Sequence, residues 1–135
     1  MAAHGERPRM INSVLETLTK YWGYTSFRLF QEEAICSILD ERDTLTILPT
    51  GGGKSLCFQL PALIREGMAV VISPLISLMK DQVDDLKELG IAAECLNSSL
   101  TNLDQSAVIE KIRSGNLKLL YLSTYLFFYI ILLKS

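Results

Sequence analysis

Apolar residues recur at helical spacing in several segments of the chain. Between residues 11 and 21 they follow the i, i+3, i+4, i+7 pattern of an amphipathic helix, which Gly23 ends. Similar patterns predict helices over residues 31–39, 54–65, 75–89 and 101–114. Pro61 lies inside the predicted helix over residues 54–65, and we expect it to kink that helix or to stop it early.

Four short apolar runs between these helices predict buried strands, at residues 44–48, 69–73, 92–96 and 117–123. Strands that alternate with helices of ten or more residues are typical of a parallel sheet with right-handed crossovers. The sequence therefore predicts an α/β fold, a parallel sheet with flanking helices. In the helix over residues 75–89, the residues expected to face the core are Leu78, Met79, Val83, Leu86 and Leu89.

Composition places the chain among globular proteins, because 49% of its 135 residues are apolar and 21% are charged. The formal charge of −2 argues against a basic nucleic-acid arm, although a local groove can still bind nucleic acid. Cys36, Cys57 and Cys95 form no CxxC pair, so we expect no zinc site and reduced thiols. Residues 1–10 read as a disordered polar tail without a secretory signal, which favours a cytoplasmic or nuclear protein.

The most specific chemical signal is a glycine-rich loop at the junction of a predicted strand and a predicted helix. Leu48-Pro49-Thr50-Gly51-Gly52-Gly53-Lys54-Ser55 has the context of a phosphate loop, although Leu48 replaces the first glycine of the strict pattern. Glycines let backbone N–H groups turn inward around phosphates, and the helix start adds partial positive charge. Lys54 can then reach the β- and γ-phosphates, and Ser55 can hold Mg²⁺.

The glycine-rich loop and the acidic pair that precedes it each have another interpretation. The loop can be a glycine-rich turn with an incidental lysine, but GGGKS at a strand-to-helix junction rarely arises by chance. The pair Asp40-Glu41 resembles an acidic Mg²⁺ motif, but it precedes the phosphate loop and ends a helix. We therefore interpret it as a charged turn.

Four segments together resemble the beginning of a RecQ-type DNA helicase of helicase superfamily two. Residues 23–31, GYTSFRLFQ, resemble the adenine-recognition motif of that family, and residues 48–59, LPTGGGKSLCFQ, resemble its motif I. Residues 73–83, SPLISLMKDQV, resemble motif Ia. Leu96-Asn97-Ser98 and residues 119–123 follow at similar intervals. The resemblance covers residues 18–123 and implies an incomplete RecA-like P-loop lobe over residues 11–123.

The resemblance implies a role for each matching residue. Gln31 would hydrogen-bond the adenine edge, Arg28 would help to hold the base, and Tyr24 would stack on it. Taken alone, Tyr24 and Arg28 could be a packed aromatic ring and a surface charge. The ATP phosphates and Mg²⁺ would be bound by the loop residues Thr50, Gly51, Gly52, Gly53, Lys54 and Ser55, with Lys54 as the catalytic residue and Ser55 as the Mg²⁺ ligand.

The segment after the second predicted strand carries a second implied site. The resemblance places single-stranded DNA at Ser73, Pro74, Leu75 and Ser77, where ligands bind at the carboxyl ends of parallel strands. The same residues also fit an ordinary helix start, with Ser73 as the N-cap and Pro74 in the first turn. The next residues, Lys80-Asp81-Gln82, could contact DNA or lie on a solvated face.

After Ser123 the sequence departs from the family pattern. The family would continue with Pro-Glu-Arg-Leu and later with an Asp-Glu-x-His strand, whereas residues 124–135 are almost entirely apolar. They could add a strand, form a short helix or contact a membrane surface; we favour a non-native ending. The acidic motif and the second lobe that hydrolysis and unwinding need are not present in these 135 residues. We therefore expect this chain alone to be marginally stable and inactive.

These observations predict the ATP-binding part of an ATP-dependent 3′–5′ DNA helicase that acts in repair and recombination. Its partners would be ATP with Mg²⁺, and single-stranded and duplex DNA. One alternative is a P-loop enzyme of another class, such as a small-molecule kinase, in which the adenine motif would have no role. Another is a non-catalytic module that binds nucleotide or DNA, in which DNA binding would survive the loss of the phosphate loop.

Overall fold

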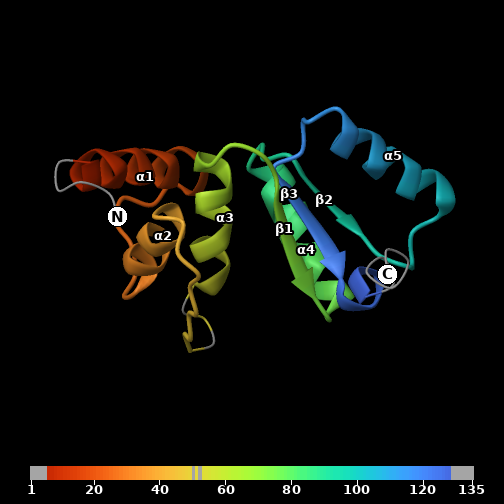
Figure 1. Ribbon diagram of the computed structural model, residues 1–135, viewed down its shortest axis with the longest axis horizontal. Helices are drawn as coiled ribbons and strands as arrows, with labels where there is room; N and C mark the ends of the chain where they lie inside the picture. Colours follow the sequence, from red (N-terminus) through yellow and green to blue (C-terminus); the bar gives the residue numbers. More distant parts are fainter. Residues whose placement is uncertain (1–5, 50, 52, 129–135) are drawn as a thin grey trace. The chain divides into compact units, whose positions relative to one another are not determined.

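A computed structural model describes residues 6–49, 51 and 53–128 of the chain, in two compact units. The N-terminal unit, Met1–Glu66, contains the helices α1 (Glu6–Trp22), α2 (Gln31–Leu39) and α3 (Lys54–Ile64). The C-terminal unit, Gly67–Ser135, contains a parallel sheet with the helices α4 and α5 (Figure 1).

The three helices of the N-terminal unit share one apolar core. α1 contributes Val14 and Leu18, α2 contributes Ile35, and α3 contributes Leu56 and Leu60. Each pair lies four residues apart, so both side chains lie on the same face of the helix. The predicted helical spacing is confirmed here, and burial of these side chains is what holds the unit together.

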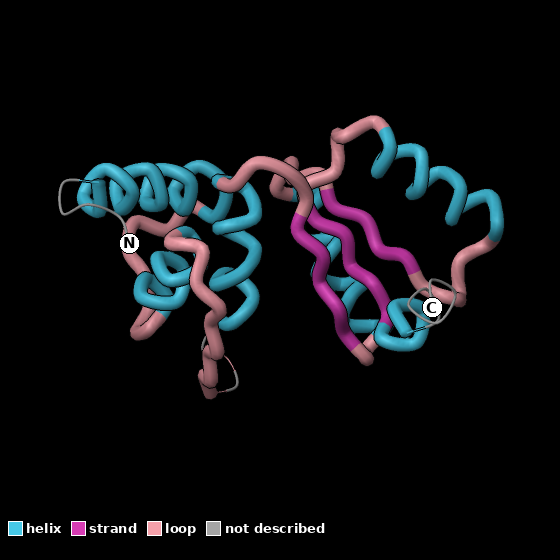
Figure 2. The backbone as a smooth tube through the Cα atoms, viewed as in Figure 1, coloured by secondary structure: helices cyan, strands magenta, loops and turns pink. Residues whose placement is uncertain are grey.

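The prediction of a strand over residues 44–48 is wrong for this structure. These residues form an extended loop (Figure 2), in which Leu48 is buried while Leu45 and Ile47 are 88% and 85% exposed. A β-strand needs a hydrogen-bonded neighbour, and the described part of the N-terminal unit contains no other strand. The β-prone composition of the segment is therefore not sufficient to make a strand here.

Two helix boundaries differ from the sequence-based expectation. α1 begins at Glu6, so residues 6–10, which we expected to belong to a disordered tail, are helical; residues 1–5 lie outside the described part. α3 continues past Pro61 to Ile64, so the proline does not stop the helix early. Pro61 is itself buried, and its packing offsets the hydrogen bond that a proline cannot donate.

The C-terminal unit is built on the three parallel strands β1 (Ala69–Ser73), β2 (Ala93–Leu96) and β3 (Leu119–Ser123), in the order β1-β3-β2. β3 lies in the centre and is buried along its whole length. Three of the four predicted strands are thus confirmed. The parallel sheet with flanking helices confirms the predicted α/β class.

The helices α4 (Ile76–Glu88) and α5 (Asn102–Arg113) cover opposite faces of this sheet. Tyr121 of β3 bonds to α4, whereas the adjacent Leu120 packs against Val108 of α5, and successive strand residues point to opposite faces. The Oγ1 of Thr101 accepts a hydrogen bond from the N–H of Asp104 and caps α5.

The inward face of α4 differs from the prediction at Leu78, and the predicted core residue Leu89 is the C-cap of α4 and only half-buried. Met79, Val83 and Leu86 are buried, but Leu78 is 45% exposed. Leu78 is offset by about 100° from Met79 around the helix, which places it at the margin of the buried stripe. Helical spacing alone does not define how wide that stripe is.

The C-terminal residues and the cysteines complete the description. Residues 124–128 are helical, and the N–H of Leu126 donates to the Oγ of Ser123; residues 129–135 of the predicted tail lie outside the described part. None of the three cysteines forms a disulfide. Within the described residues, no helix has the length and apolar character needed to cross a membrane.

Candidate nucleotide-binding and nucleic-acid sites

A pocket of about 250 Å³ opens in the N-terminal unit, where the residues after α1 meet the starts of α2 and α3. Five of the predicted site residues line it, namely Tyr24, Arg28, Gln31, Gly53 and Ser55. The structure therefore brings together the segment that resembles an adenine motif and the segment that resembles a phosphate loop. Its described lining contains no acidic side chain.

Gln31 lines this pocket, and only 3% of its surface is exposed. Its Oε1 accepts a hydrogen bond from the backbone N–H of Arg28 at 2.8 Å, and its Nε2 donates to the carbonyl of Gly53 at 3.1 Å. These two bonds fix which end of the amide is oxygen and which is nitrogen. With respect to the described residues, one lone pair and one N–H of this amide remain available, and an adenine edge requires one donor and one acceptor.

Arg28 makes a second bond to the glycine loop. Its Nη1 donates to the carbonyl of Gly51 at 2.8 Å. Arg28 and Gln31 thus bond to loop carbonyls that lie 23 and 22 residues further along the chain. A shift of the loop backbone would therefore alter the hydrogen bonds of both side chains.

Gly53 is the point of closest approach between the loop and α2. A Cβ at this position would lie 2.3 Å from the Nε2 of Gln31, and its φ of +78° is also disfavoured for other residues. Gly51 has a similar φ of +80° but an open environment. The glycine at position 53 is therefore required both by conformation and by space.

The phosphate-binding residues lie at the start of α3. Gly53 is the N-cap, and no side chain in the described structure caps this end, so the first-turn amides can serve an anion. Lys54 is exposed as the first helical residue, and Ser55 is half-buried. Thr50 and Gly52 lie outside the described residues.

Three further residues, Trp22, Leu56 and Gln59, line the pocket and were not predicted. Trp22 closes α1 beside Gly23, and Gln59 lies one turn after Ser55 on α3 and is buried. Tyr24, by contrast, is 56% exposed, and its carbonyl accepts a bond from the Oγ1 of Thr19. The i, i+4 spacing of Ser55 and Gln59 was the available signal for Gln59.

The thiol of Cys57 lies on the same helix but has no role in the pocket. Burial raises the pKa of the Cys57 thiol, so it stays protonated at neutral pH. It packs with Ala34 and Leu48 as a small apolar side chain. Among the described residues there is no cluster of His, Cys, Asp and Glu that could hold a metal ion.

The second candidate site lies in the C-terminal unit, where β1 ends and α4 begins. The N–H of Leu75 donates to the Oγ of Ser73 at 3.2 Å, and Leu75 is the N-cap of α4. The interpretation of Ser73 as the N-cap is therefore wrong. Pro74, Leu75 and Ser77 are exposed, so this turn presents open backbone and hydroxyl groups at the carboxyl edge of the sheet.

Gln82 does not belong to that open surface. It is half-buried, and its Oε1 accepts a 2.8 Å hydrogen bond from the hydroxyl of Tyr121 on β3. Lys80 and Asp81 remain exposed. Of the three residues that could have contacted DNA, Gln82 is therefore bonded to the sheet.

Comparison with known proteins gives this geometry a family. Residues 28–135 match the DEAD/DEAH box helicase family, and the chain belongs to that family. This membership agrees with the RecA-like α/β class that was predicted.

The similar proteins narrow the resemblance to the RecQ type. The chain is 56% identical to an ATP-dependent DNA helicase RecQ of Pasteurella multocida and 50% identical to one of Synechocystis, over 82% of this chain and 18% and 23% of theirs. It is 43% identical over 87% of its length to the ATP-dependent DNA helicase Q4 of Mus musculus, of which it covers 10%. The resemblance to RecQ-type helicases is confirmed; the chain spans about a fifth of the length of these bacterial relatives.

Proposed function

We propose that the N-terminal unit binds ATP with Mg²⁺, as the nucleotide-binding part of a RecQ-type ATP-dependent DNA helicase. The observation that carries the proposal is the bonding of Gln31 and Arg28 to the carbonyls of the glycine loop. This bonding fixes the base-reading amide at a set distance from the phosphate-binding helix start. An adenine nucleotide can then satisfy both ends at once.

Each residue of the pocket has a chemical task in this proposal. The unused lone pair and N–H of Gln31 pair with the amino group and ring nitrogen of adenine. The ring of Tyr24, exposed at the rim, stacks on the base, and Arg28, in the same segment between α1 and α2, helps to hold the base. The amides of Gly51, Gly52 and Gly53 surround the phosphates together with Thr50, Lys54 neutralises their charge, and the hydroxyl of Ser55 binds Mg²⁺.

The test of this proposal is a comparison of two lysine variants in the same unit. Lys54→Ala removes a charge-assisted bond to phosphate, and we expect the affinity for a fluorescent ATP analogue with Mg²⁺ to fall by roughly tenfold or more. Lys20→Ala removes an exposed lysine of α1 and should leave the affinity unchanged. Equal affinities for Lys54→Ala and the unmodified chain would refute the proposal.

We propose that a polypeptide of these 135 residues binds ATP without hydrolysing it. The described lining of the pocket supplies no carboxylate to position a water molecule or to share the Mg²⁺ ion. ATP hydrolysis that is stimulated by DNA and lost in Lys54→Ala would contradict this statement. A phosphate-release assay on the chain with saturating Mg²⁺ and ATP measures it.

The C-terminal unit supplies a DNA contact at Ser73, Pro74, Leu75 and Ser77 in this proposal. The Oγ of Ser73 accepts the N–H of Leu75, so its hydroxyl hydrogen is available for a phosphate oxygen. We expect Ser73→Ala with Ser77→Ala to weaken binding of single-stranded DNA several-fold, measured by fluorescence anisotropy. Ser106→Ala, on exposed α5, is the matched control and should have no effect.

The names of the relatives support ATP and DNA as ligands of the complete helicase. Unwinding in the 3′–5′ direction, and action in repair and recombination, are proposed from the resemblance to the RecQ type. Unwinding with the opposite polarity by a complete helicase containing this segment would contradict that part of the proposal.

A further inference from the structure

A second pocket of about 250 Å³ lies in the C-terminal unit, along the strand β2 and between α4 and α5. β2 is an edge strand, and no described strand pairs with its outer side. Lys87 of α4, Glu94 and Cys95 of β2, and Lys111 of α5 all line this pocket. It belongs to neither of the sites described above.

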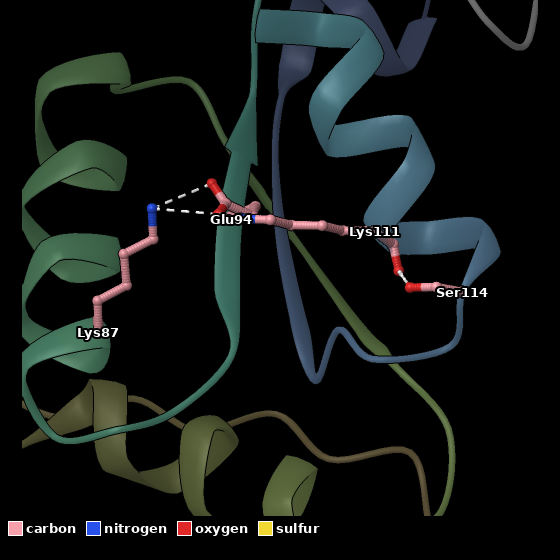
Figure 3. A network of polar contacts seen from close by, with 4 residues as sticks. All are labelled: Lys87, Glu94, Lys111 and Ser114. Carbon is pink, nitrogen blue, oxygen red and sulfur yellow. Dashed lines mark hydrogen bonds and ion pairs between the residues drawn. The ribbon is translucent and has the colours of Figure 1, made fainter.

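Glu94 joins the two helices across this edge. The Nζ of Lys87 lies 3.2 Å from both carboxylate oxygens, and the Nζ of Lys111 lies 2.5 Å from Oε1. Figure 3 shows the two lysines reaching Glu94 from opposite sides, one from α4 and one from α5. Only 12% of the Glu94 side chain is exposed, so the pair is shielded better than an ordinary surface ion pair.

The two helices differ in what else holds them to the sheet. α4 buries Met79, Val83 and Leu86, and its Gln82 accepts the hydroxyl of Tyr121. In α5, Val108 is the only buried residue among twelve. Apolar burial therefore anchors α4 strongly and α5 weakly, so that α5 depends on the ion pair to a much greater extent.

We propose that the Glu94–Lys111 ion pair is a latch that holds α5 over the pocket, and that α5 opens as a unit while α4 and the sheet stay folded. Breaking the pair removes this ionic attachment of α5 to β2 and leaves the packing of Val108 and of the partly buried Ile112. Opening uncovers the pocket and, with it, the thiol of Cys95. The latch is independent of the proposed ATP and DNA contacts.

Cys95 provides a direct readout of the opening. Its thiol is half-buried in the pocket and accepts a hydrogen bond from the Nδ2 of Asn97 at 3.2 Å. Burial raises the pKa of this thiol; Asn97, Glu94, Lys87 and Asp84 also act on it, and Lys111 is not among these groups. Lys111→Met therefore breaks the ion pair while the hydrogen bond from Asn97 to the Cys95 thiol and the charge of Glu94 are both retained.

The experiment is alkylation of the full chain by iodoacetamide, with mass spectrometry of each cysteine over time. We expect Lys111→Met to speed alkylation of Cys95 about threefold to fivefold, as loss of one ion pair allows. Cys36 and Cys57, in the other unit, should react as before. Lys111→Arg keeps the charge and should retain the original rate.

Lys87→Met is the matched control on the anchored helix. It should not speed alkylation, because α4 stays in place and because Lys87 lowers the pKa of Cys95. Hydrogen exchange is the second measurement, and in Lys111→Met it should rise in residues 102–113 and not in residues 76–88. An unchanged rate at Cys95, a rise at all three cysteines, or an equal rise in Lys87→Met would each overturn the proposal.

Discussion

The two units use their buried polar side chains in different ways. In the N-terminal unit, the amide of Gln31 bonds to Arg28 and Gly53, and Gln31 also lines a pocket. In the C-terminal unit, the Oδ1 of buried Asn97 accepts the N–H of Ser99, and Gln82 accepts the hydroxyl of Tyr121. Such bonds serve the fold alone.

This difference distinguishes a polar side chain that can bind a ligand from one that only stabilises the fold. A buried amide with unused bonding capacity is costly unless a ligand or water completes it, so it marks a site. A buried amide whose partners are all internal stabilises a turn or joins a helix to a sheet. The same residue type, glutamine, thus has a proposed recognition task at position 31 and a bond to the sheet at position 82.

The largest expected loss of stability comes from a change in the apolar core of the N-terminal unit. Leu60 is fully buried among α1, α2 and α3, so we expect Leu60→Ala to lower the free energy of unfolding by about 2–5 kcal/mol. Trp22, the only tryptophan, reports this unit in a urea titration followed by fluorescence. Leu103→Ala, at an 80% exposed position of α5, should cost less than about 0.5 kcal/mol.

The next largest loss of stability is expected at Gly53, where a side chain would both strain the backbone and collide with the amide of Gln31. In Gly53→Ala the new Cβ displaces the Gln31 amide, and we expect a loss of about 1–2 kcal/mol from the backbone alone plus about 1 kcal/mol for each broken hydrogen bond. Gly90→Ala has the same backbone cost at φ +82° with nothing within 4 Å. Equal losses of stability in the two variants would show that the contact with Gln31 is unimportant.

Tyr121 sharpens the comparison from the structural side. Its hydroxyl is buried against Gln82, so Tyr121→Phe should lower the free energy of unfolding by about 1 kcal/mol, measured by circular dichroism in urea. ATP affinity should not change. Tyr125→Phe, at a 71% exposed position, is the control, and a cost equal to that of Tyr121→Phe would argue against a stabilising bond.

The smallest effect is the pH dependence of Glu94. Burial alone would raise the pKa of this carboxyl, but hydrogen bonds and charges from Lys111 and Lys87 outweigh burial and lower it. A lowered folded-state pKa stabilises the protein above the unfolded value of about 4.3, and this stability is lost as the pH falls through the folded value. We expect Glu94→Gln to reduce this loss of stability at acid pH by less than about 1 kcal/mol. The same loss of stability in Glu94→Gln as in the unmodified chain would contradict a role of this carboxyl.

The helices could be predicted from sequence because their hydrogen bonds and apolar stripes are local. The strands of the C-terminal unit could be predicted because all three find partners within that unit. Residues 44–48 have the same β-prone composition but no neighbour in their unit, so composition misled there. Strand formation is a property of a pair of segments, which a single segment cannot specify.

The pocket was predictable to a similar extent. The resemblance to the RecQ type implied that Tyr24, Arg28 and Gln31 bind the same nucleotide as the glycine loop, and these three residues line one pocket with Gly53 and Ser55. Trp22 could not be assigned, because its place in the pocket depends on how α1 packs, whereas for Gln59 its helical spacing from Ser55 was a signal. The orientation of Gln82 toward Tyr121 depends on long-range packing in the same way.

Calorimetric titration of the chain with Mg·ATP and Mg·GTP tests the role of Gln31 most directly. We predict that the chain binds ATP about tenfold more tightly than GTP, a preference that one or two hydrogen bonds can provide. We also predict that Gln31→Ala, shown to be folded by the fluorescence of Trp22, binds both nucleotides equally. Equal affinity in the unmodified chain, or an unchanged preference in Gln31→Ala, would contradict the account.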